Sequence, residues 1–202
     1  MKDKLIKYFG IDDAKISVLP IFIDIEKIKN TAVTVDLRKK YPQFEKIVLM
    51  VSRLEKEKNI PLAIAAFKEV IKRYPKTGLV IVGSGSEKIN LKLNDNIVLD
   101  GWQSTETIYS YYKTADLFLT TSDYEGYGIT IIEALASGLP VLSTDVGIAR
   151  EAGAEITNRN NIGNDIVKYI ESGSQTAKLA NYPYKNRADY LDKFKQSFIC
   201  AF

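Results

Sequence analysis

The chain has 202 residues, of which 46% are hydrophobic and 26% are charged, and its net charge is +3. This length suits one sizeable domain with short appendages, and the composition is that of an ordinary globular protein rather than a disordered or membrane-embedded one. The charge is too small and too evenly balanced to indicate nucleic-acid binding. We therefore expect no nucleic-acid partner, whereas the binding of a small anion stays compatible with this composition.

The chain contains one cysteine, Cys200, and no histidine. A single cysteine cannot form an internal disulfide, which favours a reducing compartment, and we expect a cytoplasmic protein. The absence of histidine removes the usual zinc ligand and every catalytic triad that relies on an imidazole. No apolar run approaches the roughly 20 residues that a membrane span needs, and charges interrupt the segment where a signal peptide would lie.

In chain order, residues 1–45 form a lead-in segment with a helix-like stretch at 33–41. From 46 to 175, apolar β-rich runs alternate with segments of helical period, which predicts an α/β fold: a Rossmann-like parallel sheet with helices on both faces. The expected strands, all too apolar to have a solvated face, are 47–51, 79–82, 97–99, 117–120 and 141–143. The expected helices are 61–74, 105–112, 129–137 and 162–170. Residues 176–202 are expected to be a C-terminal helical segment, with its helix at 186–198.

In open parallel sheets the ligand lies outside the carboxyl ends of the strands, so the loops there are the places to search for a site. The loop Ser122–Gly128 joins a predicted strand directly to a helix. Its glycines permit close approach of a ligand to the backbone, and a helix N-terminus attracts anions such as phosphate. A plain strand-to-helix turn would have the same sequence, so both interpretations stay open at this point.

Glu133 is the charged residue of an otherwise apolar predicted helix. Burying an unpaired carboxylate costs several kcal/mol, about the scale of its desolvation, so Glu133 needs either a ligand or a hydrogen-bonded partner. A ribose diol could be that ligand, or another group of the protein could be a purely structural partner. A glycosidase pair formed with Glu125 is disfavoured, because eight helical residues span about 12 Å whereas glycosidase carboxyls stand roughly 5–9.5 Å apart.

Arg53 and Lys58 lie in the loop that follows the first predicted strand, where they could neutralise a diphosphate, or could be ordinary solvated charges. Gly83 and Gly85 form only a partial dinucleotide-binding motif, and the phosphate-loop signature of nucleoside triphosphatases is absent from the sequence. Trp102 follows a strand and could stack on a nucleotide base or pack locally.

Residues 46–153 resemble the retaining GT-B glycosyltransferases with an E-x7-E signature (group 1, family 4). The resemblance rests on SRLEKEKN, on VIVGSGS and on the block from GWQ to STDVG, in one unbroken register. It implies that the chain is the C-terminal, donor-binding half of a GT-B fold. Ser52, Tyr127 and Ile148 depart from the family's usual Gly, Phe and Gly.

The resemblance also implies roles for individual residues. Arg53 and Lys58 would hold the diphosphate of the donor, Glu125 would contact the hydroxyls of the transferred sugar, and Glu133 would bind the ribose. The backbone of Gly126, Tyr127, Gly128, Ile129 and Thr130 would line the sugar and the phosphates. The donor would be a UDP- or GDP-linked hexose, and neither a metal nor another cofactor would be needed.

The acceptor-binding N-terminal domain of such enzymes has no counterpart in this sequence. The resemblance therefore implies a transferase half that needs a missing domain or partner subunit, with peripheral membrane association through that partner. A non-catalytic nucleotide-binding or assembly subunit of a split glycosyltransferase is the alternative, and an epimerase of related fold is less favoured.

Overall fold

The computed structural model describes residues 2–86, 91, 93–173 and 176–199. The described chain divides into two compact units, here called the α/β unit (Ile25–Tyr182) and the terminal unit (Met1–Asp24 with Pro183–Phe202). Each is considered by itself. No helix in the described residues combines the length and the apolar character that crossing a bilayer requires.

The α/β unit contains a six-stranded sheet in which every neighbouring pair of strands is parallel. The strands are β1 (Lys46–Val51), β2 (Thr77–Val82), β3 (Ile97–Gly101), β4 (Leu117–Thr120), β5 (Val141–Ser143) and β6 (Glu155–Ile156). Their order is β3-β2-β1-β4-β5-β6. This is a doubly wound strand order, which reverses between β1 and β4. In such sheets ligands bind at that point, outside the carboxyl ends of the strands. The predicted fold class is confirmed.

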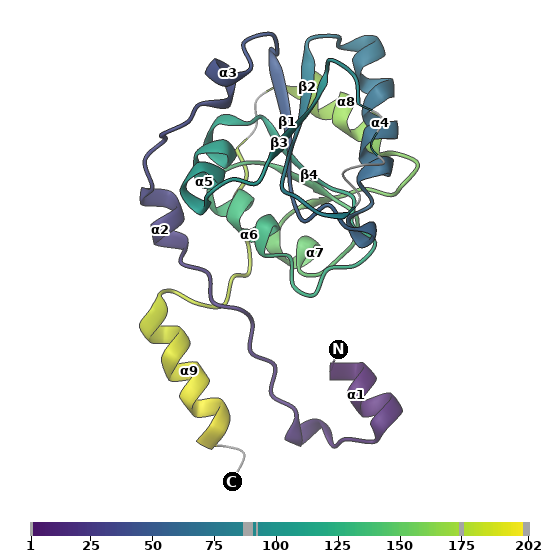
Figure 1. The fold of residues 1–202 in the computed structure, drawn as a ribbon. Coiled ribbons are helices and arrows are strands. Elements are labelled where there is room, and N and C mark those ends of the chain that lie inside the picture. Colours follow the sequence, from purple (N-terminus) through teal and green to yellow (C-terminus); the bar gives the residue numbers. More distant parts are fainter. Residues whose placement is uncertain (1, 87–90, 92, 174–175, 200–202) are drawn as a thin grey trace. The chain divides into compact units, whose positions relative to one another are not determined.

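Helices cover both faces of the sheet (Figure 1). On one face, α4 (Ile60–Arg73) and α8 (Ile162–Ser172) contact each other, and on the other α5 (Thr105–Thr114) contacts α6 (Ile129–Ala136). Val48 and Met50 belong to the core cluster with Phe67 of α4, so alternation along the strand turns Ile47 and Leu49 towards the opposite face. Complete burial of a side chain such as Phe67 contributes about 2–3 kcal/mol. Shorter helices are α2 (Ile25–Asn30), α3 (Leu37–Lys40) and α7 (Ala149–Ala152), with a 3-10 turn η2 (Lys56–Lys58).

Two expectations about individual elements are wrong, and one short strand was not expected. The stretch 33–41 is helical only over α3, which begins after Asp36, because the Asp36 carboxylate accepts a hydrogen bond from the Arg38 amide and caps the helix there. Strand β3 is buried only at Ile97, because it is an edge strand with a neighbour on one side. Strand β6 was not predicted, since two residues are too few for a periodic pattern.

The terminal unit joins the two ends of the chain. It contains α1 (Lys2–Phe9), a 3-10 turn η1 (Asp13–Lys15) and α9 (Arg187–Ile199). Tyr190 of α9 packs on Phe22 and Tyr184, with ring centroids 5.3 and 5.1 Å away, and the Tyr184 hydroxyl donates to the carbonyl of Pro20 at 2.8 Å. The helix expected at 186–198 is thus present, and aromatic contacts hold it to the lead-in segment.

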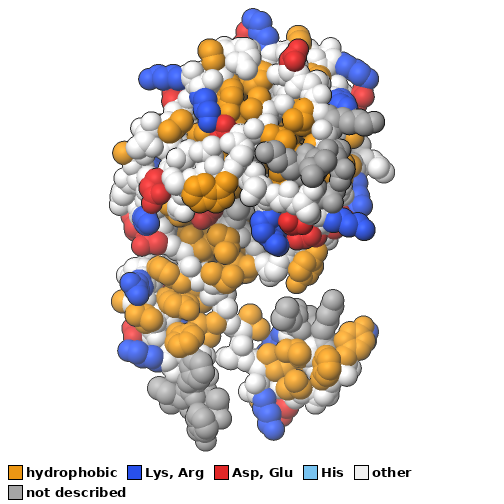
Figure 2. All heavy atoms as spheres, viewed as in Figure 1, with side chains coloured by type: hydrophobic (Ala, Val, Ile, Leu, Met, Phe, Trp, Pro, Cys, Tyr) orange, Lys and Arg blue, Asp and Glu red, His pale blue; other side chains and the backbone are white. Residues whose placement is uncertain are grey.

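On the face drawn in Figure 2, charged side chains are distributed rather than gathered. Figure 2 shows lysines and arginines interspersed with acidic residues on the visible face, without one broad basic patch. This agrees with the balanced charge of the sequence.

Candidate functional site

The loop after β1 and the loop after β4 are bonded together at the carboxyl edge of the sheet. The Thr121 hydroxyl donates to the carbonyls of Lys58 and Asn59, both at 3.1 Å, and the Asp123 amide donates to the Glu57 carbonyl at 2.8 Å. Asn59 adopts a left-handed conformation (φ 49°) as α4 begins, which asparagine tolerates better than most residues. These bonds bring residues distant in sequence to the point where the strand order reverses.

Lys58 and Glu125 form an ion pair between those two loops. Lys58 Nζ lies 2.7 Å from Glu125 Oε2, and their side chains are only 13% and 15% exposed. The other carboxylate oxygen of Glu125 accepts a hydrogen bond from the Ser122 hydroxyl at 2.7 Å, and Ser122 is itself within 3.2 Å of the Thr120 hydroxyl. A sheltered cation and a held carboxylate therefore meet at the expected edge.

Arg53 is placed differently from Lys58. Its side chain is 72% exposed, and its Nη2 lies 3.1 Å from Glu57 Oε1. Such an exposed pair contributes little stability, about 0–1 kcal/mol, and its partners can separate easily. Arg53 can therefore turn towards a ligand at low cost.

Helix α6 begins at Gly128, whose φ of 99° is a left-handed conformation that glycine adopts without strain. Among the described residues no side chain caps this helix, because Gly128 has none at the N-cap position. The Gly128 carbonyl accepts from Ile131 and Ile132, so the amides of Gly128, Ile129 and Thr130 precede the intrahelical bonds. This terminus has the geometry and dipole of an anion site.

The loop after β5 supports the segment from Gly126 to Gly128. The Ile148 amide donates to the Tyr127 carbonyl at 2.8 Å. A Cβ atom on Gly147, whose φ is 53°, would lie 2.4 Å from the same carbonyl oxygen. Gly147 therefore permits the close approach of the two loops. The hydrogen bond from Ile148 fixes the backbone that precedes α6.

Glu133 lies one turn further along α6 and is held by tyrosines of α5. The Tyr112 hydroxyl donates to Glu133 Oε2 at 3.2 Å, and Tyr109 also hydrogen-bonds to this carboxylate. Burial raises the pKa of Glu133 above its usual value, and the two tyrosine hydrogen bonds oppose that rise. The carboxylate of Glu133 therefore has two hydrogen-bond partners within the protein.

A cavity of about 260 Å³ is lined in part by Arg53 and by Thr130 of α6. Its wall includes Ser52, Trp102, Gln103, Ile108 and Thr130. Trp102 is 75% exposed, so its ring is accessible. Ile108 and Tyr112 are four residues apart on α5, and Thr130 and Glu133 are three apart on α6. Residues at these spacings share a helix face, so Tyr112 and Glu133 lie on the same faces of α5 and α6 as Ile108 and Thr130 of the cavity wall.

The two glycines of the partial motif after β2 have a packing role. A Cβ atom on Gly83 would lie 1.9 Å from the Ser52 carbonyl oxygen, and one on Gly85 would lie 2.3 Å from that of Leu54. They allow the loop after β2 to pack on the loop after β1. The close approach of backbone to backbone, rather than to a dinucleotide, accounts for both.

Sequence reasoning missed Ser122, Tyr109 and Tyr112. Ser122 stands three residues before Glu125 in the same loop, and that spacing was a usable signal. Nothing local connects Tyr112 with Glu133, which lies 21 residues away on another helix. The described residues contain no group of three or more His, Cys, Asp or Glu side chains that could hold a metal ion.

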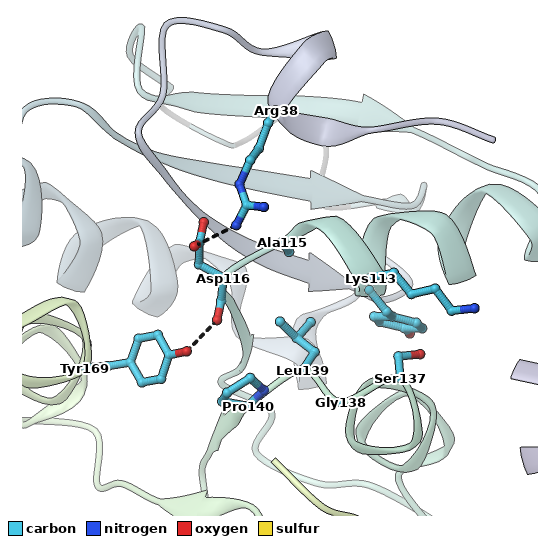
Figure 3. A pocket seen from close by; sticks show the side chains of 10 residues that line it. Arg38, Lys113, Ala115, Asp116, Ser137, Gly138, Leu139, Pro140 and Tyr169 are labelled. Carbon is cyan, nitrogen blue, oxygen red and sulfur yellow. Dashed lines mark hydrogen bonds and ion pairs between the residues drawn. The ribbon is translucent and has the colours of Figure 1, made fainter. Parts of the chain in front are cut away.

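A second polar cavity, of about 110 Å³, lies at the opposite, amino edge of the sheet (Figure 3). Asp116 accepts hydrogen bonds there from Arg38 Nη2 at 2.9 Å, from Lys46 Nζ at 3.2 Å and from the Ile47 amide at 2.9 Å. The Tyr169 hydroxyl donates to the Asp116 carbonyl at 2.7 Å. The carboxylate of Asp116 is therefore satisfied by donors of the protein itself.

Fold and site together define a doubly wound α/β domain that presents a cation, a carboxylate and a helix N-terminus at its ligand-binding edge. Residues 36–174 match the sequence profile of the family described as glycosyl transferases group 1. The chain belongs to this family, as the resemblance predicted.

Known proteins similar to this chain are longer than it is. The alpha-monoglucosyldiacylglycerol synthase of Streptococcus pneumoniae is 37% identical over 106 residues, which cover 49% of this chain and 24% of that protein. The poly(glycerol-phosphate) alpha-glucosyltransferase of Bacillus subtilis is 32% identical over 167 residues, which cover 72% of this chain and again 24% of that protein. The matched region thus spans about a quarter of either relative.

A solved structure that matches is itself a single domain. The C-terminal domain of the group 1 family protein LpcC from Francisella tularensis superposes with a TM-score of 0.61 at 21% identity. The superposition covers 74% of this chain and 88% of that domain. At this identity the likeness shows the fold alone.

Proposed function

We propose that this chain is the donor-binding, C-terminal half of a retaining glycosyltransferase, which moves a hexose-type sugar from a UDP- or GDP-sugar to a glycan, lipid or other acceptor. The ion pair between Lys58 and Glu125 is the observation that carries the proposal. A sheltered cation and a carboxylate lie in it beside the uncapped N-terminus of α6, where they could bind phosphate and sugar hydroxyls respectively. Family membership supports this assignment.

The donor would lie along the carboxyl edge. Its base would occupy the cavity beside Trp102, its ribose would bond to Glu133, and its diphosphate would lie between the start of α6 and the pair Arg53 and Lys58. The sugar would then reach Glu125 and the backbone of residues 126–130. This order is supported by the helix faces, because Ile108 and Thr130 of the cavity wall lie on the same faces of α5 and α6 as Tyr112 and Glu133.

The proposed chemistry uses the leaving group as the base. The bond between the anomeric carbon and the phosphate oxygen breaks, and a bond from the acceptor oxygen to that carbon forms on the same face. The acceptor proton passes to the departing phosphate oxygen. Arg53, Lys58 and the α6 dipole would stabilise the negative charge that develops on this oxygen, which is the largest contribution such a site can make. No step requires histidine or a metal.

Reaction would require a second domain or a partner subunit to bind the acceptor. The length of the matched relatives supports this, because the matched region is about a quarter of either. Both relatives' names contain an alpha-linked glucosyl group, which supports a hexose as the sugar. We propose a cytoplasmic location, with any membrane contact made through the missing partner.

Trp102 offers a direct test, since it is the single tryptophan of the chain and lines the cavity. UDP and GDP should change its fluorescence with saturation at or below millimolar concentration, whereas uridine, which lacks phosphate, should bind more weakly. Arg53→Ala should lower the affinity for the preferred diphosphate. If neither UDP, GDP nor their sugars bind by calorimetry at millimolar concentration, the proposed function is wrong.

A further inference from the structure

Ser52 stands at the end of β1, immediately before Arg53. Its amide donates to the carbonyl of Val82 at 3.0 Å, so its backbone continues the sheet and is fixed in place. Its hydroxyl oxygen is shielded from solvent and has no hydrogen-bond partner among the described residues. A buried hydroxyl without a partner forfeits the bonds that water gave it in the unfolded chain.

Nearby hydroxyls at the same edge of the sheet are satisfied. Thr121 donates to two carbonyls of the loop after β1, and Ser122 donates to Glu125. Buried polar groups in native proteins are bonded in the great majority, and an exception calls for an explanation. Ser52 is thus an exception within a well-bonded region.

The surroundings of Ser52 point to a ligand. Ser52 lines the 260 Å³ cavity together with Arg53, Gly83, Ser84 and Trp102. Gly83 contributes only backbone beside it, since a Cβ atom there would lie 1.9 Å from the Ser52 carbonyl oxygen. A serine hydroxyl moves between staggered positions by rotation about one bond, so it can turn towards a molecule in the cavity.

We propose that the Ser52 hydroxyl hydrogen-bonds to the nucleoside diphosphate bound in this cavity, and so is a donor-binding residue. This inference rests on the proposed function and adds to it a residue that neither the family match nor the relatives assign. The hydroxyl is kept without a protein partner because the ligand supplies one.

Calorimetry with UDP and GDP on the wild type, Ser52→Ala and Ser52→Gly tests the inference. Loss of one hydrogen bond between neutral or singly charged groups should weaken binding of the preferred diphosphate about three- to tenfold in both variants. Without ligand, Ser52→Ala should unfold at the same temperature as the wild type or a slightly higher one, because an unsatisfied hydroxyl has been removed, whereas Ser52→Gly should unfold at a somewhat lower one because glycine loses more backbone entropy on folding. The rise in melting temperature that the diphosphate produces should be smaller in both.

The outcomes separate this inference from the function on which it rests. If the wild type binds a diphosphate, Arg53→Ala weakens it and Ser52→Ala and Ser52→Gly bind as the wild type does, then the Ser52 inference alone is overturned. If the wild type binds no diphosphate, both fall. If Ser52→Ala loses affinity in proportion to a loss of stability without ligand, the residue is structural and the inference is again overturned.

Discussion

The two edges of the sheet carry similar residues with different consequences. At the amino edge, the carboxylate of Asp116 is 6% exposed and accepts from two cationic side chains and one amide (Figure 3). At the carboxyl edge, Lys58 and Glu125 are also sheltered, but they stand beside an uncapped helix N-terminus, and the same edge has an open cavity lined by Arg53 and Thr130. Both cavities are polar in part. What distinguishes the structural cluster around Asp116 from the candidate site is the set of groups that surrounds each one.

The helix dipoles explain the difference. Helices α5 and α6 end at the amino edge, where their C-termini favour positive charge, and Arg38 and Lys113 lie there. At the carboxyl edge α6 begins, and its N-terminus favours negative charge. At the amino edge, cationic side chains of the described residues lie at the helix C-termini. At the carboxyl edge, no side chain of the described residues caps the N-terminus of α6, and an anionic ligand could bind there.

The largest expected effect tests the amino edge. Asp116→Ala removes the common acceptor of Arg38, Lys46 and the Ile47 amide, and we expect a loss of about 2–3 kcal/mol in the free energy of unfolding, the Arg38 share being small because that side chain is half exposed. Urea denaturation measures it. Diphosphate affinity of the folded protein should not change, and a large change would contradict the structural role of this edge.

The next effect tests the carboxyl edge. Lys58→Ala should weaken UDP or GDP binding about 10- to 100-fold, equivalent to about 1.4–2.7 kcal/mol, because a charge-assisted contact to phosphate is lost and Glu125 is left beside the anion. Lys56→Ala, in the same turn but exposed, is the matched control and should bind within about twofold of the wild type. Equal losses in the two variants would mean that Lys58 acts through general charge alone.

The third effect tests the proposed hydrogen bond between Glu133 and the ribose of the donor. Glu133→Gln should reduce the preference for UDP over 2′-deoxy-UDP about tenfold, on the order of one charged hydrogen bond. Tyr112→Phe should reduce it less, because Tyr109 still holds the carboxylate. Calorimetry with the two nucleotides measures the ratio, and an unchanged ratio in Glu133→Gln would assign Glu133 a purely structural role.

The pH dependence of stability gives Glu133 a second test. Burial raises its pKa in the folded state above the usual 4.5, so the folded protein binds the proton more tightly than the unfolded chain does. The stability of the wild type relative to Glu133→Gln should therefore be greatest below pH 4.5 and should fall as pH rises through the raised pKa. Denaturation series at several pH values would show this slope, and a slope of opposite sign would contradict it.

The smallest expected effect concerns Glu125. Glu125→Gln removes the negative partner of Lys58, so the free diphosphate should bind about threefold more tightly, while the gain from adding the sugar should shrink because the carboxylate no longer accepts from sugar hydroxyls. Comparison of UDP with UDP-glucose by calorimetry separates the two. Weaker binding of both ligands would show that the ion pair serves mainly to hold the loops.

The sequence by itself determined five of the six strands, the longer helices of the α/β unit and the family. Uniformly apolar runs such as Ile47–Val51 and the first-turn Pro61 are local signals, because strand and helix periods repeat within a few residues. The resemblance also placed Lys58 and Glu125 in one site, and the structure brings those two together across 67 positions.

Only the tertiary structure decided which polar groups are satisfied. Asp116 receives three protein donors, Glu133 receives two tyrosines, and the Ser52 hydroxyl has no partner among the described residues. None of this follows from spacing, because each partner comes from another element of the fold. The physical reason is that desolvation and hydrogen bonding depend on what surrounds an atom in space, and the chain order does not record it.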